Sequence, residues 1–282
     1  MSDGSTTAVV HEVGELRARR RRPRAVVMTM GALHDGHLSL VAEARRLVGP
    51  FGEVWVTVFV NPLQFGAGED FEAYPRTLTT DVEACRAAGV DVVFAPSGTV
   101  MYPDREPQTR VVPGRAGDGL ESDQRPGHFS GMLTVVLKLL NITNPDIALF
   151  GEKDYQQLVL IRTMVRDFDL PVQVVGVPTA READGLARSS RNIYLTSEQR
   201  KTAAAVPRSL AAARRAAEAG ADADGVLAVA GRELDGLEVD YLELRAPDLE
   251  PAPVAGPSRL LVAVRLGTTR LLDNCAIELR PT

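Results

Sequence analysis

Hydrophobic residues along this chain form short continuous runs, and the segments between those runs carry hydrophobic residues at helical spacing. The runs Val26–Thr29 and Val54–Val60 are rich in β-branched residues, which is typical of strands that are covered on both faces. Between them, residues 38–48 repeat apolar side chains every three or four positions, which predicts a helix with one buried face. The chain therefore opens as strand, helix, strand.

The same alternation continues as far as about Pro178. Helices are predicted at 81–88, 131–140 and 155–168, and strands at 90–94, 146–150 and 172–177. Repeated strand–helix–strand units imply right-handed crossovers and parallel strands. We therefore predict an α/β fold with a doubly wound, Rossmann-like parallel sheet.

The pattern changes after Pro178. Residues 197–236 are rich in alanine and helical in pattern, and the segments VDYLELR, RLLVAVRL and NCAIELR then have the composition of strands. A chain of 282 residues is long enough for two domains. We expect a Rossmann-like, ligand-binding domain at 1–178 and a smaller α+β lid domain at 179–282.

Composition narrows the class of protein. Hydrophobic residues make up 45% of the chain and charged residues 24%, as in ordinary globular proteins. The net charge of −5 argues against a nucleic-acid partner, because nucleic-acid binders usually carry excess positive charge. Cys85 and Cys275 lie in no motif, so neither a disulfide framework nor a metal knuckle is indicated. No apolar run would span a bilayer and no signal-peptide pattern is present, so we expect a cytoplasmic protein without a membrane partner.

The basic run RARRRRPR, Arg17–Arg24, has two interpretations. It matches a nucleic-acid patch by composition. It also matches a solvated helix end, where cations complement the helix dipole and Pro23 stops the helix. The acidic balance of the whole chain favours the second interpretation.

Three polar motifs follow predicted strands: TMGALHDGHLSL at 29–40, VNPLQFG at 60–66 and FGEKDYQQ at 150–157. Open α/β sheets bind ligands at the carboxyl ends of their strands, so we expect these motifs to form one site. His34 and His37 stand three positions apart at the start of a helix, where both rings face the free N–H groups that bind phosphate.

Three other interpretations of this histidine pair compete. A metal site would need more ligands than His11 and His128 offer. A P-loop is excluded, because its Lys and Ser/Thr are replaced by His37 and Leu38. A pair of helix caps without a catalytic role remains open.

The ordered set of motifs resembles the pantoate–β-alanine ligase family of the HxGH nucleotidyltransferases. The resemblance runs from about Val26 to the last predicted strand, and rests on these strings: TMGALHDGHLSL, VFVNPLQFG, YPRT, RPGHF, TVVLKLLNI, FGEKDYQQL, READGLARSSRNIYL, DYLELR and GTTRLLDN. It implies that ATP and pantoate form an enzyme-bound pantoyl adenylate with release of pyrophosphate. The amine of β-alanine then attacks the acyl carbon and AMP is released.

The resemblance also assigns residues. His34 and His37 correspond to the pair that binds the phosphates, and His37 to the proton donor, with Mg²⁺ neutralising the triphosphate. The implied ATP site comprises Met30, Gly31, His34, Gly36, His37, Gly151, Glu152, Lys153, Asp154, Ala180, Arg188, Ser189, Ser190 and Arg191. A homodimer is implied as well.

Lys153 and two glutamines also have a chemical argument of their own. Lys153 is one of only three lysines among 32 basic residues, which suggests a need for a compact ammonium that a guanidinium does not replace. Gln64 and Gln157 are neutral amides, which bind a hydroxyl and a carboxylate without damping the nucleophilicity of the carboxylate. The resemblance assigns both to pantoate, and Gln64 to the β-alanine path. Lys153 is also open to interpretation as a solvated surface residue, and one of Gln156 and Gln157 to a place on the helix surface.

The polar segment ARSSRN at 187–192 resembles a loop that closes over the triphosphate, and is also typical of a hinge. Several positions depart from the family pattern: Asp35, Thr80, Ser122, Ala180 and Arg188. Thr80 stands where a second carboxylate often accompanies Asp81, which leaves Asp81 as a weak candidate for a magnesium ligand. The other candidate residues match, so we expect an active enzyme.

Two alternative functions remain open at this stage. An adenylyl- or cytidylyltransferase shares HxGH but leaves the nucleotide on its product, whereas the ligase releases AMP. A nucleotide sensor on the same fold would bind ATP without releasing pyrophosphate. An aminoacyl-tRNA synthetase is disfavoured, because the chain is short, acidic and without an anticodon module.

Overall fold

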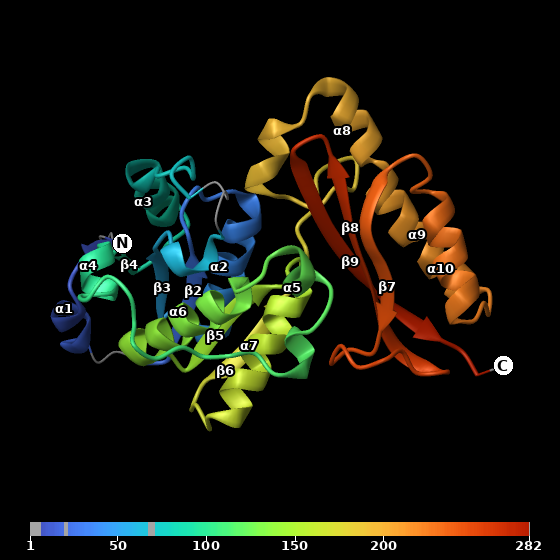
Figure 1. Ribbon diagram of the computed structural model, residues 1–282. Helices are drawn as coiled ribbons and strands as arrows, with labels where there is room; N and C mark the ends of the chain where they lie inside the picture. The colour runs from blue at the N-terminus through green and yellow to red at the C-terminus, as the bar shows by residue number, and fades with distance from the viewer. Residues whose placement is uncertain (1–6, 20–21, 67–70, 282) are drawn as a thin grey trace. The chain divides into compact units, whose positions relative to one another are not determined.

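The computed structural model describes residues 7–19, 22–66 and 71–281. Contacts divide the chain into two compact units. The first contains 1–152 and 160–178, and the second contains 153–159 and 179–282. The two units are described separately below, and their elements are labelled in Figure 1.

The first unit is built on a six-stranded parallel sheet in the order β1-β4-β3-β2-β5-β6. The strands are β1 (Ala8–Val10), β2 (Arg24–Thr29), β3 (Glu53–Val58), β4 (Val92–Phe94), β5 (Ile147–Gly151) and β6 (Gln173–Val177). The chain moves outward from β2 to β3 and β4, and then returns to place β5 on the other side of β2. The carboxyl ends of β2 and β5 therefore flank a topological switch point, where such sheets bind ligands.

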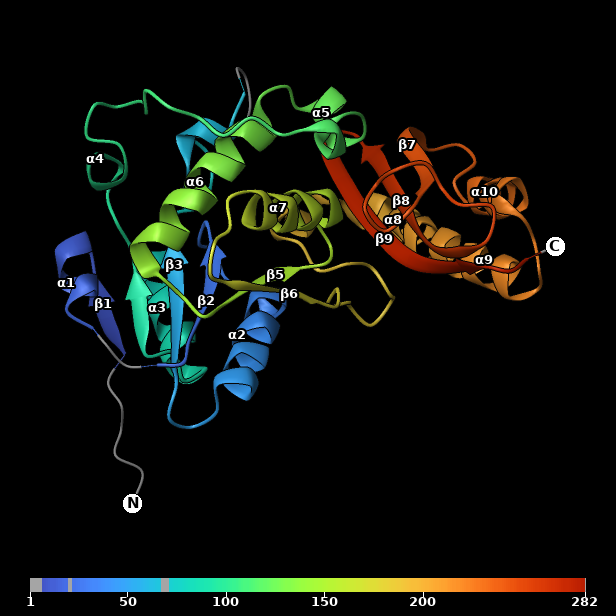
Figure 2. The same ribbon diagram turned by 90° about the horizontal axis from the view of Figure 1, so that it is seen from below.

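Helices cover both faces of this sheet, which confirms the predicted α/β doubly wound fold. The longer ones are α2 (Asp35–Val48), α3 (Leu78–Ala87), α6 (His128–Thr143) and α7 (Tyr155–Asp167). Figure 2 shows α2 and α3 on one face and α6 and α7 on the other. Short helices and 3-10 turns complete the unit: α1 (Val13–Arg17), η1 (Pro62–Gln64), α4 (Gly98–Met101), η2 (Arg115–Gly117) and α5 (Glu121–Gln124).

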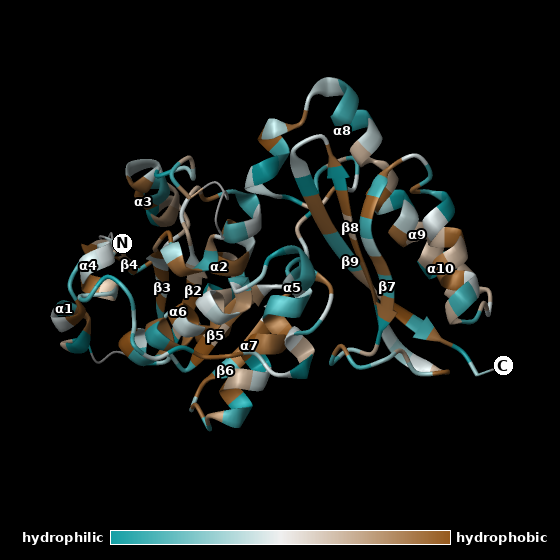
Figure 3. Ribbon diagram, viewed as in Figure 1, coloured by the Kyte–Doolittle hydropathy of each residue, from teal (hydrophilic) through white to brown (hydrophobic). Residues whose placement is uncertain are grey.

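The core of the first unit explains the continuous apolar strands of the sequence. Buried valines of β2 and β3 pack against Leu40, Val41 and Ala44 of α2. Because helices lie on both faces, successive strand residues are buried in both directions, and much of each strand has the brown, hydrophobic colour in Figure 3.

The second unit contains a three-stranded antiparallel sheet, β7 (Glu238–Arg245), β8 (Gly256–Leu266) and β9 (Thr269–Leu279), in that order. Its helices are α8 (Ser197–Ala203), α9 (Ala205–Glu218) and α10 (Ala223–Arg232), and η3 (Ser190–Tyr194) precedes them. Leu260, Val262 and Val264 of β8 belong to one buried cluster with Val206 and Leu210 of α9. Alanines of α9 add little bulk, so the helix lies close to the strands (Figure 1).

Two sequence predictions need correction. The strand β1 and the helix α1 were not predicted, because three and five residues are too short to show a period. The basic run was interpreted as one solvated helix end stopped by Pro23, but α1 ends at Arg17 and Arg24 belongs to β2. Arg20 and Arg21 lie outside the described residues.

Arg24 is buried inside the first unit rather than solvated. Its guanidinium lies 3.6 Å from the ring centre of Trp55 and 3.5 Å from a carboxylate oxygen of Glu53. It also donates to the carbonyl of Thr143 at 2.7 Å. Burial lowers the pKa of Arg24, although the carboxylate of Glu53 opposes that shift. The guanidinium of Arg24 is thus part of the packed core and does not belong to a basic surface patch.

Candidate active site

The loop after β2 turns sharply before it enters α2. Gly31 and Ala32 both have positive φ, at 85° and 51°. A Cβ on Gly31 would lie 3.0 Å from a carboxylate oxygen of Asp81 and 3.2 Å from Val58. Glycine is therefore required here by both backbone conformation and space.

Asp81 holds this loop in place from helix α3. Its side chain is buried at 2% exposure and accepts hydrogen bonds from the backbone N–H groups of Leu33 at 2.8 Å and Ala32 at 3.1 Å. The hydroxyl of Thr77 donates to it as well, at 3.2 Å. The carboxylate that the sequence offers as a magnesium ligand is thus already engaged by the main chain just before His34.

The two histidines form the start of α2. His34 is the N-cap, and its Nδ1 accepts from the N–H of Gly36 at 3.1 Å. The Nδ1 of His37 accepts from the N–H of His34 at 3.3 Å, and the ring centres are 4.1 Å apart. A neutral imidazole that accepts at Nδ1 carries its proton on Nε2. Capping and proton donation are therefore compatible roles, because each uses a different ring nitrogen.

The other two histidines each bond a main-chain carbonyl. His11 Nδ1 bonds the carbonyl of Ala95 at 2.7 Å, and His128 Nδ1 bonds the carbonyl of Gln64 at 2.9 Å. Among the described residues, no group of three or more His, Cys, Asp or Glu side chains is arranged to hold a metal. Burial raises the pKa of Cys85 to about 12 and of Cys275 to about 11, so both are protonated thiols at neutral pH.

Gln64 ends the turn η1 and is buried in the first unit at 8% exposure. Asn61 Nδ2 donates to its side-chain oxygen at 2.9 Å, and Tyr102 donates its hydroxyl proton to Asn61 Oδ1 at 2.9 Å. Burial raises the pKa of Tyr102 to about 12, so this hydroxyl keeps its proton at neutral pH. The chain of bonds fixes the amide orientation of Gln64, in which the oxygen accepts from Asn61 and the NH₂ group is a donor.

Helix α6 reaches η1 through a glycine. A Cβ on Gly131 would lie 1.9 Å from the carbonyl oxygen of Leu63, a distance no side chain tolerates. Asn61 Nδ2 also donates to the carbonyl of Gly131, at 3.1 Å. The position of Gln64 therefore depends on the absence of a side chain at 131.

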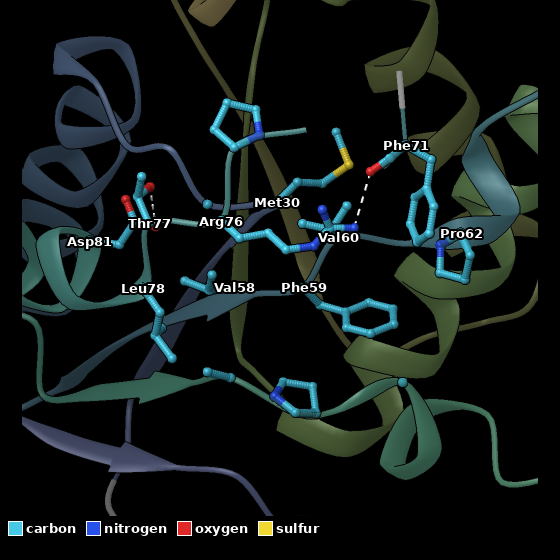
Figure 4. Close-up of a pocket in the computed structure, with 15 residues that line it drawn as sticks. Met30, Val58, Phe59, Val60, Pro62, Phe71, Arg76, Thr77, Leu78 and Asp81 are labelled. Atoms are coloured by element: carbon cyan, nitrogen blue, oxygen red, sulfur yellow. Dashed lines mark hydrogen bonds between the residues drawn. The ribbon is translucent and has the colours of Figure 1, made fainter. Parts of the chain in front are cut away.

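A cavity of about 370 Å³ lies at the carboxyl ends of β2, β3 and β4, and Figure 4 shows the side chains around it. Met30 and Gly31 of the predicted ATP site line it, together with Phe59, Phe71 and Asp81. Arg76 closes one side and donates to the carbonyl of Phe71 at 3.0 Å. Most of the lining is apolar, so the cavity suits an uncharged group.

The second unit contains several other predicted residues. Arg181 and Ala187 pair as an antiparallel bridge, and the N–H of Arg188 donates to the carbonyl of Ala180 at 2.9 Å. Residues 180–188 thus form a hairpin that leads into η3. Ser189 caps η3 by accepting from the N–H of Arg191 at 3.3 Å.

Lys153 and this capped turn line the same small cavity of the second unit. Its lining includes Lys153, Ser189, Arg191 and Arg270. Lys153 Nζ lies 3.2 Å from Asp154 Oδ1, and the cavity volume of about 10 Å³ suffices for one water. Three residues predicted to bind phosphate are therefore grouped, and Arg270 joins them without having been predicted.

The remaining predicted residues follow strand β5. The N–H of Glu152 donates to the carbonyl of Val177 at 2.8 Å, so the chain beyond Gly151 continues along β6. Gln157 is half-buried on α7, whereas its neighbour Gln156 is buried at 3% exposure.

Residues 5–276 match the sequence profile of a family described as pantoate-beta-alanine ligase. The chain belongs to this family. A pantothenate synthetase of Salinispora arenicola is 54% identical over 98% of this chain and 99% of that protein. A pantothenate synthetase of Mycolicibacterium smegmatis is 57% identical over 93% of this chain and 83% of that protein. As a member of the pantoate-beta-alanine ligase family, the chain is an ATP-dependent ligase.

Solved structures of the family share the fold. The crystal structure of pantothenate synthetase from Thermus thermophilus has a TM-score of 0.90 and 47% identity, over 98% of this chain and 100% of that chain. The pantoate-beta-alanine ligase of Francisella tularensis, complexed with beta-gamma ATP and beta-alanine, has a TM-score of 0.78 and 33% identity, over 95% and 97% of the two chains. The resemblance and the fold class predicted from the sequence are confirmed. No helix in the described part of the chain has the length and apolarity needed to cross a membrane.

Proposed function

We propose that this ligase condenses pantoate with β-alanine through an enzyme-bound pantoyl adenylate. A carboxylate oxygen of pantoate attacks the α-phosphorus of ATP, and the bond to pyrophosphate breaks. The amine of β-alanine then attacks the acyl carbon, the bond to AMP breaks, and the amine loses a proton. The observation that carries the proposal is the histidine pair at the start of α2, with Nε2 of each ring left as the proton-bearing nitrogen.

The histidines act on the phosphates in this proposal. Negative charge develops on the α-phosphate and on the departing pyrophosphate, so donors held at a helix N-terminus stabilise the transition state. His37 supplies a proton or hydrogen bond from Nε2, and His34 acts beside it. We assign Met30, Gly31 and Gly36 to ATP, and the lack of a side chain at Gly36 allows ATP close to the main chain.

Side chains of the second unit act on the same ATP in this proposal. Lys153 provides a compact ammonium, and Ser189, Ser190 and Arg191 provide further donors to the triphosphate. Ala180 and Arg188 face each other across the base of the hairpin, and we assign them to ATP together with 151–154. The relative of Francisella tularensis, with its beta-gamma ATP and beta-alanine, supports this choice of substrates.

The acid and the amine are recognised by amides. We assign pantoate to Gln64 and Gln157, and β-alanine to Gln64. A neutral amide orients the carboxylate of pantoate but leaves its electrons available for attack, which a tight cation pair would not. The hydrogen bonds that fix the Gln64 amide support this role.

Magnesium enters with ATP as part of the substrate, where it neutralises charge on the triphosphate. The described residues do not fit a separate protein-held magnesium site, because no carboxylate cluster is present and the oxygens of Asp81 serve the loop. The proposal also keeps the homodimer and the cytoplasmic location, which rest on the family resemblance and on the sequence pattern.

An omission assay tests the reaction. With ATP, Mg²⁺, pantoate and β-alanine, we expect AMP and pantothenate in equal amounts, and no AMP when either organic substrate is omitted.

His37→Ala should lower turnover by about 10²–10³ with the fold intact, as loss of one transition-state donor does. A product that keeps the nucleotide would indicate a nucleotidyltransferase, and ATP binding without pyrophosphate release would indicate a sensor. Near-normal turnover of His37→Ala would show that His34 and His37 act only as caps of helix α2.

A further inference from the structure

Two adjacent polar residues of β9, Asp273 and Asn274, are buried at 3% exposure each. Neither had a predicted role, although both close the GTTRLLDN string. Burying a polar or charged side chain is costly unless its hydrogen bonds are satisfied. Their partners therefore indicate what these residues are for.

Asp273 holds the hairpin that leads to the phosphate loop. Both of its oxygens accept from the guanidinium of Arg181, at 2.6 and 3.0 Å. Arg181 pairs with Ala187 across the hairpin and donates to the carbonyl of Gly185 at 3.0 Å. This bidentate ion pair thus attaches the segment just before Ser189 to β9.

Asn274 holds the main chain at Lys153. Its Nδ2 donates to the carbonyl of Lys153 at 2.8 Å, and its Oδ1 accepts from Arg259 Nε at 2.7 Å. The guanidinium of Arg259 lies 4.1 Å from the ring centre of Tyr155, two positions after Lys153. The hydroxyl of Tyr155 donates to the carbonyl of Pro247 at 2.9 Å. Several bonds therefore hold 153–155 against other parts of the second unit.

Successive side chains of a strand point to opposite faces of the sheet. Asp273 and Asn274 are neighbours on β9 and consequently bind two different segments of the chain. The N–H of Asn274 also donates to the carboxylate of Asp273, at 2.8 Å. The two segments carry Lys153 on one side and Ser189 to Arg191 on the other. Lys153, Ser189 and Arg191 from these segments line the small cavity of the second unit.

We propose that Asp273 and Asn274 are positioning residues for the triphosphate of ATP: together they set the spacing between the Lys153 ammonium and the Ser189–Arg191 turn. Neither side chain contacts the nucleotide in this proposal. The inference rests on the proposed function, in which both segments bind the same ATP. Adjacent residues of a paired strand cannot move independently, so the two segments bound to Asp273 and Asn274 keep a fixed position relative to each other.

Asn274→Asp isolates the contact with Lys153. It keeps the shape of the side chain and an acceptor for Arg259, but loses the donor to the Lys153 carbonyl. We expect the KM for ATP to rise about tenfold, as loss of one hydrogen bond to a positioned group predicts. The KM values for pantoate and β-alanine should stay within about twofold, because the contact serves only the ATP segment. Asp273→Asn should act in the same direction through the hairpin.

The matched control is Ser209→Ala. Ser209 is buried at 0% exposure and donates to the carbonyl of Ala230 at 2.9 Å. The substitution therefore also removes one buried hydrogen bond from a side chain to the main chain of the second unit. It should lower Tm as much as Asn274→Asp does and leave the KM for ATP unchanged. If the KM for ATP changes equally in both variants, or if all three KM values rise together, the positioning role is wrong.

A double-mutant cycle sharpens the test. In a Lys153→Ala background, Asn274→Asp should have little further effect on the KM for ATP, because the ammonium that Asn274 positions is gone. Full additivity of the two changes would overturn the proposal. A wild-type enzyme that makes no AMP would instead contradict the proposed function and leave these residues to a structural role.

Discussion

At the scale of single residues, the polar side chains that order the site are buried ones with distant partners. Asp81 contacts the main chain of Ala32 and Leu33, almost fifty positions earlier, and Asn274 contacts Lys153 across more than a hundred. Motifs at strand ends gave the sequence its candidates for contact with phosphate, and these assignments stay predictions. The sequence did not predict the residues that hold those motifs, because a buried acid or amide has no local pattern.

Asp81 gives a test at this scale. Asp81→Asn keeps the size of the side chain but replaces one acceptor oxygen by a donor, which repels one of the two loop N–H groups. We expect kcat to fall roughly tenfold to a hundredfold, since misplacement of groups near the reaction by about 1 Å has such effects. The magnesium concentration for half-maximal activity should not change. Rates measured across a magnesium titration provide the comparison.

The control for this variant is Glu83→Gln, which removes an exposed carboxylate from the same helix α3. It should change neither kcat nor the magnesium requirement. A magnesium requirement that rises sharply in Asp81→Asn alone would show that this carboxylate is a metal ligand, as the family resemblance first suggested.

At the scale of elements, periodic segments were predictable and aperiodic ones were not. Helix α2 and strand β3 were predicted to within a few residues, because each has a full hydrophobic face. The three residues of β1 have none, and β1 depends on its pairing with β4. The hairpin at 180–188 was not predicted, and only the polar segment 187–192 was expected, as a loop or hinge. The ion pair that shapes the hairpin comes from β9, which no local pattern indicates.

The contact of α6 with η1 gives a test at this scale. Gly131→Ala places a methyl group 1.9 Å from the carbonyl oxygen of Leu63, so η1 or α6 must move. We expect the free energy of unfolding to fall by about 1–3 kcal/mol, as for overpacking in a core. The clash is with the main chain, which cannot turn aside as a flexible side chain can. Gln64 moves with η1, so the KM for pantoate should also rise. Thermal denaturation and steady-state kinetics measure the two effects.

Gly231→Ala is the matched control, because Gly231 lies within α10 and its Cβ would meet only Leu242, at 3.7 Å. Alanine favours a helix over glycine, so this variant should be at least as stable as the parent, with unchanged kinetics. Parent-like stability and pantoate affinity in Gly131→Ala would mean that η1 tolerates displacement and does not position Gln64.

At the scale of the whole molecule, the candidate residues fall into both units. His34, His37 and Gln64 belong to the first, whereas Lys153, Gln157 and Ser189 belong to the second. The sequence placed a boundary near Pro178 from the change of pattern alone. Grouping of 153–159 with the second unit depends on tertiary bonds such as Tyr155 to Pro247, which no local pattern indicates.

In the proposed two-step reaction, the enzyme activates pantoate as the adenylate before β-alanine is needed. With ATP, Mg²⁺ and pantoate alone, we expect release of about one pyrophosphate per active site and then no further turnover, because an adenylate held away from water persists. Adding β-alanine should restart turnover, through its neutral amine. A quenched-flow measurement of pyrophosphate gives the amplitude. Continuous release of pyrophosphate without β-alanine would show that the adenylate is hydrolysed or never retained.

Isotope transfer decides whether that intermediate is an adenylate. In the proposed reaction one carboxylate oxygen of pantoate bridges the acyl carbon and the α-phosphorus, and it leaves with AMP when the amine attacks the carbon. Pantoate labelled with ¹⁸O in its carboxylate should therefore transfer one labelled oxygen to each AMP, which mass spectrometry detects. An acyl phosphate would instead yield ADP and place the label in inorganic phosphate. Unlabelled AMP would contradict the adenylate, and with it the roles assigned to His37, Lys153 and Gln157.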